Sequence, residues 1–216
     1  MDRKTLDRRR LGGTIAALLL VLGLGAACTG TGPGQKAGSP PADIAGLVHV
    51  CSSCHGPGGY SISSTFPRLA GQQKDYLVAQ LKAFRDHKRA DPHAKTYMWG
   101  MAARLSDAQI EALAAYYSSR PPVPGEPANT PAVAAGRQIF DNGIPAEGVP
   151  ACKACHGDRA QGRSVFPRLA GQHRAYIEEQ LRAFKTNARE NAIMHHNAKN
   201  LTPEQIRDIA AYVRTL

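Results

Sequence analysis

The sequence has no long hydrophobic run, few aromatic residues and no extended period-two alternation of polar and apolar residues. Its longest apolar run, residues 14–27, is too short for a typical membrane-spanning helix. The basic residues are scattered, and aromatic residues make up only 6% of the chain, so nucleic-acid binding is not expected. Because no segment alternates long enough to favour a strand, the sequence predicts an all-α protein.

The length and charge of the chain suggest two small domains with a basic surface. Its 216 residues suffice for one large domain or two small ones, and small domains often need a cofactor to complete their core. The net charge is +10; without the segment before Cys28, 22 basic and 15 acidic residues remain, a net charge of about +7. This charge is consistent either with simple solubility or with docking to acidic protein partners.

The N-terminus has the pattern of an export signal. Residues 1–27 combine a basic start with an apolar run and are predicted to be a signal peptide or membrane-targeting segment. The small residues before Cys28 resemble a bacterial lipoprotein processing site, so lipidation of Cys28, ordinary cleavage and a retained anchor all stand as outcomes. Residues 28–41, rich in Gly, Pro, Thr and Ser, are predicted to form a flexible tether. We expect a periplasmic protein, tethered to the membrane if Cys28 is lipidated.

The four other cysteines form two copies of Cys-x-x-Cys-His, at residues 51–55 and 152–156. This is the attachment motif of a c-type haem, in which two thiols add to the vinyl groups and the histidine binds the iron. A thioredoxin-like pair would need a βαβ context, and a four-cysteine zinc site would leave both histidines unexplained. We therefore predict two covalently attached haem c groups, with His55 and His156 as iron ligands and thioether bonds at Cys51, Cys54, Cys152 and Cys155.

The two motifs belong to a longer internal repeat. Residues 66–72 recur without change at 166–172, and the closing segment 105–116 recurs in similar form at 201–212. The offset is 100 in the first stretch and 96 in the last, so the second copy lacks four residues between them. The domains are therefore predicted as 42–119 and 132–216, separated by a semi-rigid linker at 120–131 that holds five prolines.

Apolar residues at helical spacing predict three main helices in each domain. Both closing helices begin with a capping box, formed by Ser106 with Gln109 and by Thr202 with Gln205. The expected helices cover residues 42–54, 72–86, 107–118, 132–141, 172–188 and 203–215.

The sixth iron ligand decides whether a haem binds substrate or only carries electrons. Met98 lies seven residues before Leu105, and Met194 lies seven before Leu201, so the two methionines correspond across the repeat. No spare histidine is paired in this way. A methionine at helical spacing is more often core filler, but the recurrence favours ligation here. We predict Met98 and Met194 as the second ligands, and therefore no catalytic residue.

Three further pairs or positions invite a role at the haems. Arg68 and Arg168, in the identical stretch, are expected to bind haem propionates, with solvated surface arginines as the alternative. Tyr76 and Tyr176 are expected to pack as haem walls, and Trp99 to pack at a haem edge.

In combination, these motifs resemble the dihaem cytochrome c4 family, over residues 42–216. The resemblance implies two tandem class I cytochrome c domains related by pseudo-two-fold symmetry, with electron exchange between the haems. It also implies a periplasmic role between a quinol-oxidising complex and a terminal oxidase, often at the membrane surface. Carried over by position, the iron ligands are His55 with Met98 and His156 with Met194.

Two other functions are weighed against an electron carrier without a small-molecule substrate. A dihaem peroxidase or thiosulfate-oxidising enzyme needs an open or unusually ligated haem, and no cysteine remains for such a ligand once Cys28 is assigned to the signal. A cytochrome subunit of a larger oxidoreductase, such as a sulfide-oxidising flavocytochrome, would have the same haem chemistry and differ only in its partner.

Overall fold

The computed structural model describes residues 43–216. The predicted signal segment, the tether and Cys28 lie outside these residues. The described part is helical, with two isolated β-bridges and no strand, which confirms the all-α prediction. None of its helices has the length and apolar character needed to cross a membrane.

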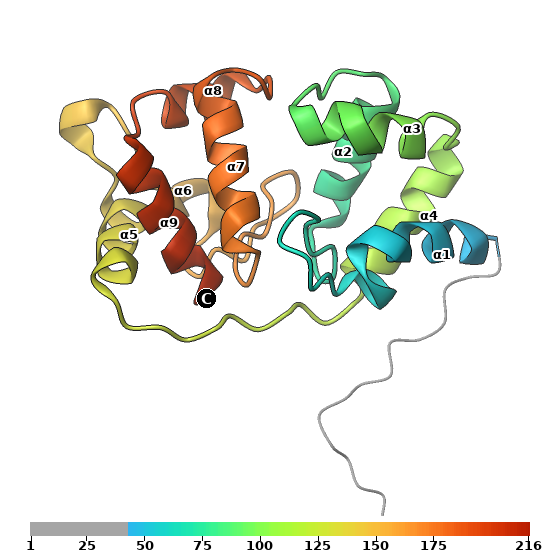
Figure 1. Ribbon diagram of the computed structural model, residues 1–216, viewed down its shortest axis with the longest axis horizontal. Coiled ribbons are helices and arrows are strands. Elements are labelled where there is room, and N and C mark those ends of the chain that lie inside the picture. Colours follow the sequence, from blue (N-terminus) through green and yellow to red (C-terminus); the bar gives the residue numbers. More distant parts are fainter. Residues whose placement is uncertain (1–42) are drawn as a thin grey trace, which may run out of the picture. The chain divides into compact units, whose positions relative to one another are not determined.

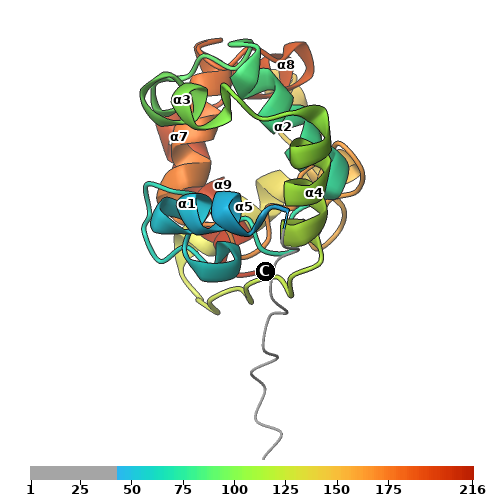
Figure 2. The ribbon, with the colours of Figure 1, turned by 90° about the vertical axis from the view of Figure 1, so that its right-hand side faces the viewer.

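The helices fall into two halves that lie side by side (Figure 1). In the N-terminal half, the four α-helices are α1 (Ala45–His55), α2 (Lys74–Arg85), α3 (Trp99–Ala102) and α4 (Asp107–Ser118). A 3-10 turn, Pro57–Gly59, follows α1, and a π-helical segment, Ala94–Met98, runs directly into α3. Figure 2 views this half face on, with α1 to α4 around its middle.

The C-terminal half repeats this order with a longer approach to its cysteine motif. Its α-helices are α5 (Pro131–Asn142), α6 (Lys153–His156), α7 (Arg174–Lys185), α8 (Ala192–Ala198) and α9 (Pro203–Arg214). A 3-10 turn, Pro145–Glu147, lies between α5 and α6. Each half has its own apolar core, centred on Ile110 and Leu113 in the first and on Phe140 and Ile206 in the second.

The predicted capping boxes are confirmed, but some helix bounds are wrong by up to three residues, as at the start of α1 and the end of α7. The Ser106 hydroxyl accepts the N–H of Gln109, and Thr202 accepts that of Gln205 in the same way, with the reciprocal bonds also formed. The helix expected over 172–188 ends at Lys185. It ends there because Asn187 takes a left-handed conformation, with φ of 59°, which stops the helix in the way a C-terminal glycine does.

The linker has a fixed path along the C-terminal half. Pro131, placed in the linker by its sequence, is instead the first residue of α5, where its missing N–H costs nothing, and Thr130 caps the helix. The backbone N–H of Glu126 donates to the carbonyl of Arg214 (3.0 Å), and its carboxylate pairs with Arg68 (3.7 Å) and Arg214. The linker therefore connects to residues of both halves.

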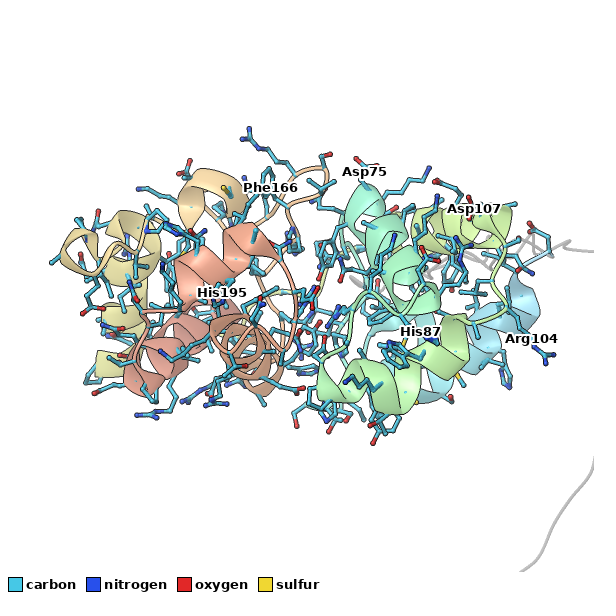
Figure 3. All side chains as sticks on the ribbon, turned by 90° about the horizontal axis from the view of Figure 1, so that it is seen from above. Asp75, His87, Arg104, Asp107, Phe166 and His195 are labelled. Atoms are coloured by element: carbon cyan, nitrogen blue, oxygen red, sulfur yellow. The ribbon has the colours of Figure 1, made fainter. Side chains whose placement is uncertain are left out.

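Reciprocal hydrogen bonds join the two halves at the repeated Pro-Arg-Leu-Ala-Gly-Gln stretch. The Gln172 amide accepts from the backbone N–H of Arg68 (2.9 Å) and donates to its carbonyl (3.0 Å). The Gln72 amide makes the same pair of bonds to Arg168 (2.7 and 2.9 Å). At the edge, Ser164 donates to Asp75 (2.8 Å) at the start of α2 (Figure 3).

Candidate haem sites

Each cysteine motif ends in a buried histidine whose ring orientation is fixed. His55 is the last residue of α1 and His156 the last of α6. The ring Nδ1 atoms donate to the carbonyls of Pro67 (2.9 Å) and Pro167 (3.0 Å), which leaves each Nε2 available to a metal. Burial lowers the pKa of both histidines, so the imidazoles are neutral, as iron ligation requires.

The four motif cysteines are free thiols, with no disulfide among the described residues. Burial raises the pKa of Cys51 and raises that of Cys152 to about 11, so these thiols are protonated at neutral pH. Among the described residues, no group of three or more Cys, His, Asp or Glu is placed to hold a metal ion, which argues against a zinc site formed by the cysteines.

Both candidate methionines line the same cavity as the histidines. Met98 is the last residue of the π-helical segment, and Met194 lies on α8. Each is half-buried and packs against the core of its own half. The four residues that the second half lacks fall just before its methionine, because Met98 lies seven residues after Asp91 and Met194 only three after Asn191. The π-helical segment accommodates the longer connection in the first half.

The cavity is large enough and apolar enough for a cofactor. Its volume is about 630 Å³, within the range of roughly 300–1,000 Å³ typical of ligand sites. Apolar side chains from corresponding helices form its walls, among them Leu77 and Phe84 on α2 and Ile177 and Phe184 on α7. The candidate ligating and attaching residues on its surface are Cys51, His55, Met98, Cys152, Cys155, His156 and Met194. Cys54, in contrast, is exposed.

The two repeated arginines lie in different surroundings. The guanidinium of Arg68 donates to the carbonyls of Ser61 (3.3 Å) and Gly171, so protein groups already engage it. In Arg168, Nε is buried without a hydrogen-bond partner in the described part of the chain. Burial, and then the charge of Arg159, lowers the pKa of Arg168. An unsatisfied buried N–H beside this cavity is what an anionic group such as a haem propionate would complete.

A second arginine pair, not identified from the sequence, lies in the cavity wall between the halves. Arg89 and Arg189 are each 7% exposed. Both donate to the amide oxygens of Gln80 and Gln180, at 2.7–2.9 Å. The equal offset of 100 between the two arginines was the available signal, since Gln80 and Gln180 share it.

The two tyrosines do more than pack against a cofactor. The Tyr76 hydroxyl accepts from Arg189 (2.9 Å) and the Tyr176 hydroxyl from Arg89 (3.4 Å), each across the boundary between the halves. Burial raises the pKa of Tyr76, but the positive charges of Arg189 and Arg89 outweigh this and lower the pKa overall. The tyrosines therefore belong to a buried polar cluster that joins the halves.

Trp99 does not line the cavity, contrary to its expected place at a haem edge. Its indole N–H donates to the carbonyl of Arg89 (2.8 Å), and its ring stacks on His87 with centroids 4.1 Å apart (Figure 3). Trp99 thus holds the backbone of the segment that carries Arg89, and Arg89 itself lines the cavity.

Comparison with known proteins places these sites in a family. The Cytochrome c family model matches residues 42–120 and again 133–216. Cytochrome c-552 of Acidithiobacillus ferridurans is 41% identical over 203 residues, 93% of this chain and 85% of that protein. The thiosulfate dehydrogenase electron acceptor of Thiomonas intermedia is 39% identical over 189 residues, 84% of this chain and 82% of that protein.

A solved structure, that of Acidithiobacillus ferrooxidans cytochrome c4, superposes with a TM-score of 0.73 at 44% identity, and covers 77% of this chain and 98% of its own. Family membership and the two Cys-x-x-Cys-His motifs together mean two covalently attached haem c groups, one in each tandem cytochrome c domain. The chain belongs to the dihaem cytochrome c4 family and is an electron carrier.

Proposed function

We propose that each iron is six-coordinate and low-spin, bound by His55 and Met98 in the N-terminal half and by His156 and Met194 in the C-terminal half. The observation that carries this proposal is that each half brings a neutral, oriented histidine and a methionine to the wall of one cavity. A site closed on both sides leaves no position for a substrate.

Each haem supplies a one-electron couple at its iron, and the surrounding residues set the conditions under which it operates. The Pro67 and Pro167 carbonyls hold the histidine rings in place through a change of iron charge. A thioether ligand favours reduced iron and raises the reduction potential. The apolar walls exclude water, which limits the reorganisation that accompanies electron transfer.

The attachment and propionate contacts complete the proposal. Cys51 and Cys54 would form thioether bonds to the first haem, and Cys152 and Cys155 to the second. Arg168, with its unsatisfied Nε, is favoured as a propionate donor. Arg68 stays a predicted propionate contact, although its guanidinium already bonds to protein carbonyls.

Replacing each methionine tests the ligation. Oxidised wild-type protein should show the long-wavelength absorption band of sulfur-to-iron charge transfer from two haems. Met98→Ala and Met194→Ala should each remove about half of this band, and the double variant all of it. Met101→Ala is the matched control, because Met101 lies three residues from Met98 but is 57% exposed. A band that survives both single changes contradicts the assignment.

We further propose that the protein works in the periplasm between a quinol-oxidising complex and a terminal oxidase, with Cys28 either lipidated at the membrane or removed with the signal. The chain from Cys28 onward has 22 basic and 15 acidic residues, and this net charge of about +7 supports docking to acidic partner surfaces. Stopped-flow reduction by a purified quinol-oxidising complex should be fast and should slow as ionic strength rises. Mass spectrometry of the native protein distinguishes a lipidated Cys28 from a cleaved N-terminus.

A second candidate donor is a thiosulfate-oxidising enzyme. The relative from Thiomonas intermedia, similar over most of this chain, is named as the electron acceptor of thiosulfate dehydrogenase. The haem chemistry would be unchanged, and only the donor would differ. Reduction by such a dehydrogenase with thiosulfate, at a rate above that of the quinol-oxidising complex, would favour this donor.

A further inference from the structure

The segments that carry the two methionines begin with equivalent caps of different charge. The Asp91 carboxylate accepts the backbone N–H of Ala94 (3.3 Å), three residues on, at the start of the π-helical segment. The Asn191 amide oxygen accepts the N–H of Met194 (2.9 Å), also three residues on. Asp91 and Asn191 correspond at an offset of 100. The same structural position therefore holds a negative charge in one half only.

The two caps also differ in their exposure to solvent. Asp91 and Asn191 both line the cavity, but Asp91 is only 1% exposed, whereas Asn191 is exposed to solvent. The second Asp91 oxygen accepts from Nε of Arg89 at 2.7 Å. Burial alone would lower the pKa of Arg89, but Tyr176, Tyr76 and Asp91 raise it, so this guanidinium stays charged. Asp91 is thus a buried carboxylate of the N-terminal half that lies in the cavity wall and is held there by a cation.

The other arginine of the pair has no such partner. Arg189 donates to Gln80, Gln180 and Tyr76, and its guanidinium lies over the ring of Phe184 (4.5 Å). Among the described residues, no carboxylate is within ion-pair distance of it. The adjacent Glu190 also lines the cavity, but it is exposed, so solvent screens its charge. Both arginines bond to groups of both halves, so their positive charges lie at the boundary and belong to neither half alone. The negative charge of Asp91, which pairs with Arg89, comes from the N-terminal half.

We propose that Asp91 is a potential-determining residue that lowers the reduction potential of the N-terminal haem relative to the C-terminal one. Oxidised iron carries one more positive charge than reduced iron, and a nearby carboxylate shielded from water stabilises the oxidised form. Electrons would therefore rest mainly on the C-terminal haem when one electron is present. This inference relies on the axial ligation proposed above.

The decisive variant is Asp91→Asn, which keeps the cap acceptor and removes the charge. In a spectroelectrochemical titration, with the haems assigned by NMR of their methyl signals in the oxidised protein, the N-terminal haem should be easier to reduce. We expect its reduced-to-oxidised ratio at a fixed potential to rise about tenfold, or about 59 mV, and the C-terminal haem to shift by less than half as much. Equal shifts, or none, would overturn the inference.

Two further variants serve as a control for solvent screening and as a safeguard against loss of folding. Asn191→Asp places a charge at the equivalent but exposed position and should change either potential much less, because solvent screens it. Asp91→Asn with Arg89→Gln removes the buried ion pair as a unit, which protects folding if the single variant is unstable. The gap between the potentials should narrow in this double variant as well, and an unchanged gap counts against Asp91.

The sulfur-to-iron band separates the two proposals. If wild-type protein shows the band from both haems and Asp91→Asn leaves the gap between the potentials unchanged, the role of Asp91 is wrong and the ligation stands. If the wild-type band is missing, the proposed ligation itself fails.

Discussion

The two halves share a sequence repeat but differ in how closely their first helix packs. α5 approaches α9 so closely at Gly136 that a Cβ atom there would collide with the backbone carbonyl of Asp208. Gly46 in α1, which also follows an alanine, has nothing within 4 Å of the corresponding position. The first helix of the N-terminal half is held instead by side chains, chiefly Ile44 and Val48. Each first helix thus contains an Ala-Gly pair, but only the glycine of α5 lies in close contact with the backbone of another helix.

The halves also differ in the segment that carries the methionine. Four extra residues in the N-terminal half are taken up by a π-helical turn, whereas the C-terminal half uses a regular α-helix. The repeat preserves the distance along the chain from each methionine to its closing helix. The difference in length lies in the segment that precedes the methionine. The position proposed for an iron ligand can therefore persist while the chain leading to it changes in length.

The largest effect expected from this comparison comes from the two glycines. Gly136→Ala should destabilise the protein by about 3 kcal/mol, because the backbone of α9 cannot move away without disturbing the core. Gly46→Ala should leave stability unchanged or raise it by about 0.5 kcal/mol through helix propensity. Urea unfolding of the haem-loaded protein, followed by absorbance and far-UV circular dichroism, measures both. Equal costs would mean that the halves pack alike.

A smaller effect is expected at the two interface tyrosines. Tyr76→Phe removes the 2.9 Å bond from Arg189 and should cost about 1 kcal/mol, since Arg189 lacks a carboxylate partner in the described residues. Tyr176→Phe removes a longer bond, 3.4 Å, to an arginine that Asp91 already pairs, and should cost less. The same unfolding experiment ranks the two variants, and a larger loss in Tyr176→Phe would contradict the asymmetry of the cluster.

The smallest effect concerns pH and compares His173 with Gln73. His173 donates to the carbonyl of Ser61 (3.0 Å), and Gln73 makes the matching bond to Gln161 (2.9 Å). Burial, and then the charge of Arg68, lowers the pKa of His173 from its ordinary 6.5. Protons then bind the unfolded chain more readily, so the stability from this site is complete above pH 6.5 and is lost as pH falls through the lowered value.

The loss of stability should stay below about 1 kcal/mol, because the ring is half-exposed and solvent screens its charge. His173→Gln should flatten this part of the profile of melting temperature between about pH 5 and 7.5. Gln73→Ala is the control, which should lower stability equally at all these pH values. A profile that His173→Gln leaves unchanged would assign the pH dependence to other groups.

The sequence was informative wherever a chemical constraint repeats in it. The cysteine motifs predicted the attached haems, and the capping boxes predicted where the closing helices begin. The repeat also singled out Met98 and Met194, whose ligation still awaits its test. Each of these signals is local, since it depends on a few neighbouring residues whose spacing has one good physical explanation.

What escaped prediction depends on contacts between segments far apart in the chain. Arg89 and Arg189 look like surface residues until the two halves are brought together, because burial between domains has no local signature. The end of α7 escaped for a different, local reason. Asn187 and its counterpart His87 adopt left-handed conformations that glycine more often supplies, with φ of 59° and 57°.

The reciprocal bonds of Gln72 and Gln172 suggest how the molecule came to have two haems. Each bond from one half has its counterpart from the other, so a chain with a single half could pair with an identical copy through the same groups. Duplication of such a chain, followed by fusion through a linker, would fix that pairing permanently. Only after fusion can equivalent positions of the two halves hold different residues, as Asp91 and Asn191 do, so that the two ends of the carrier become distinguishable.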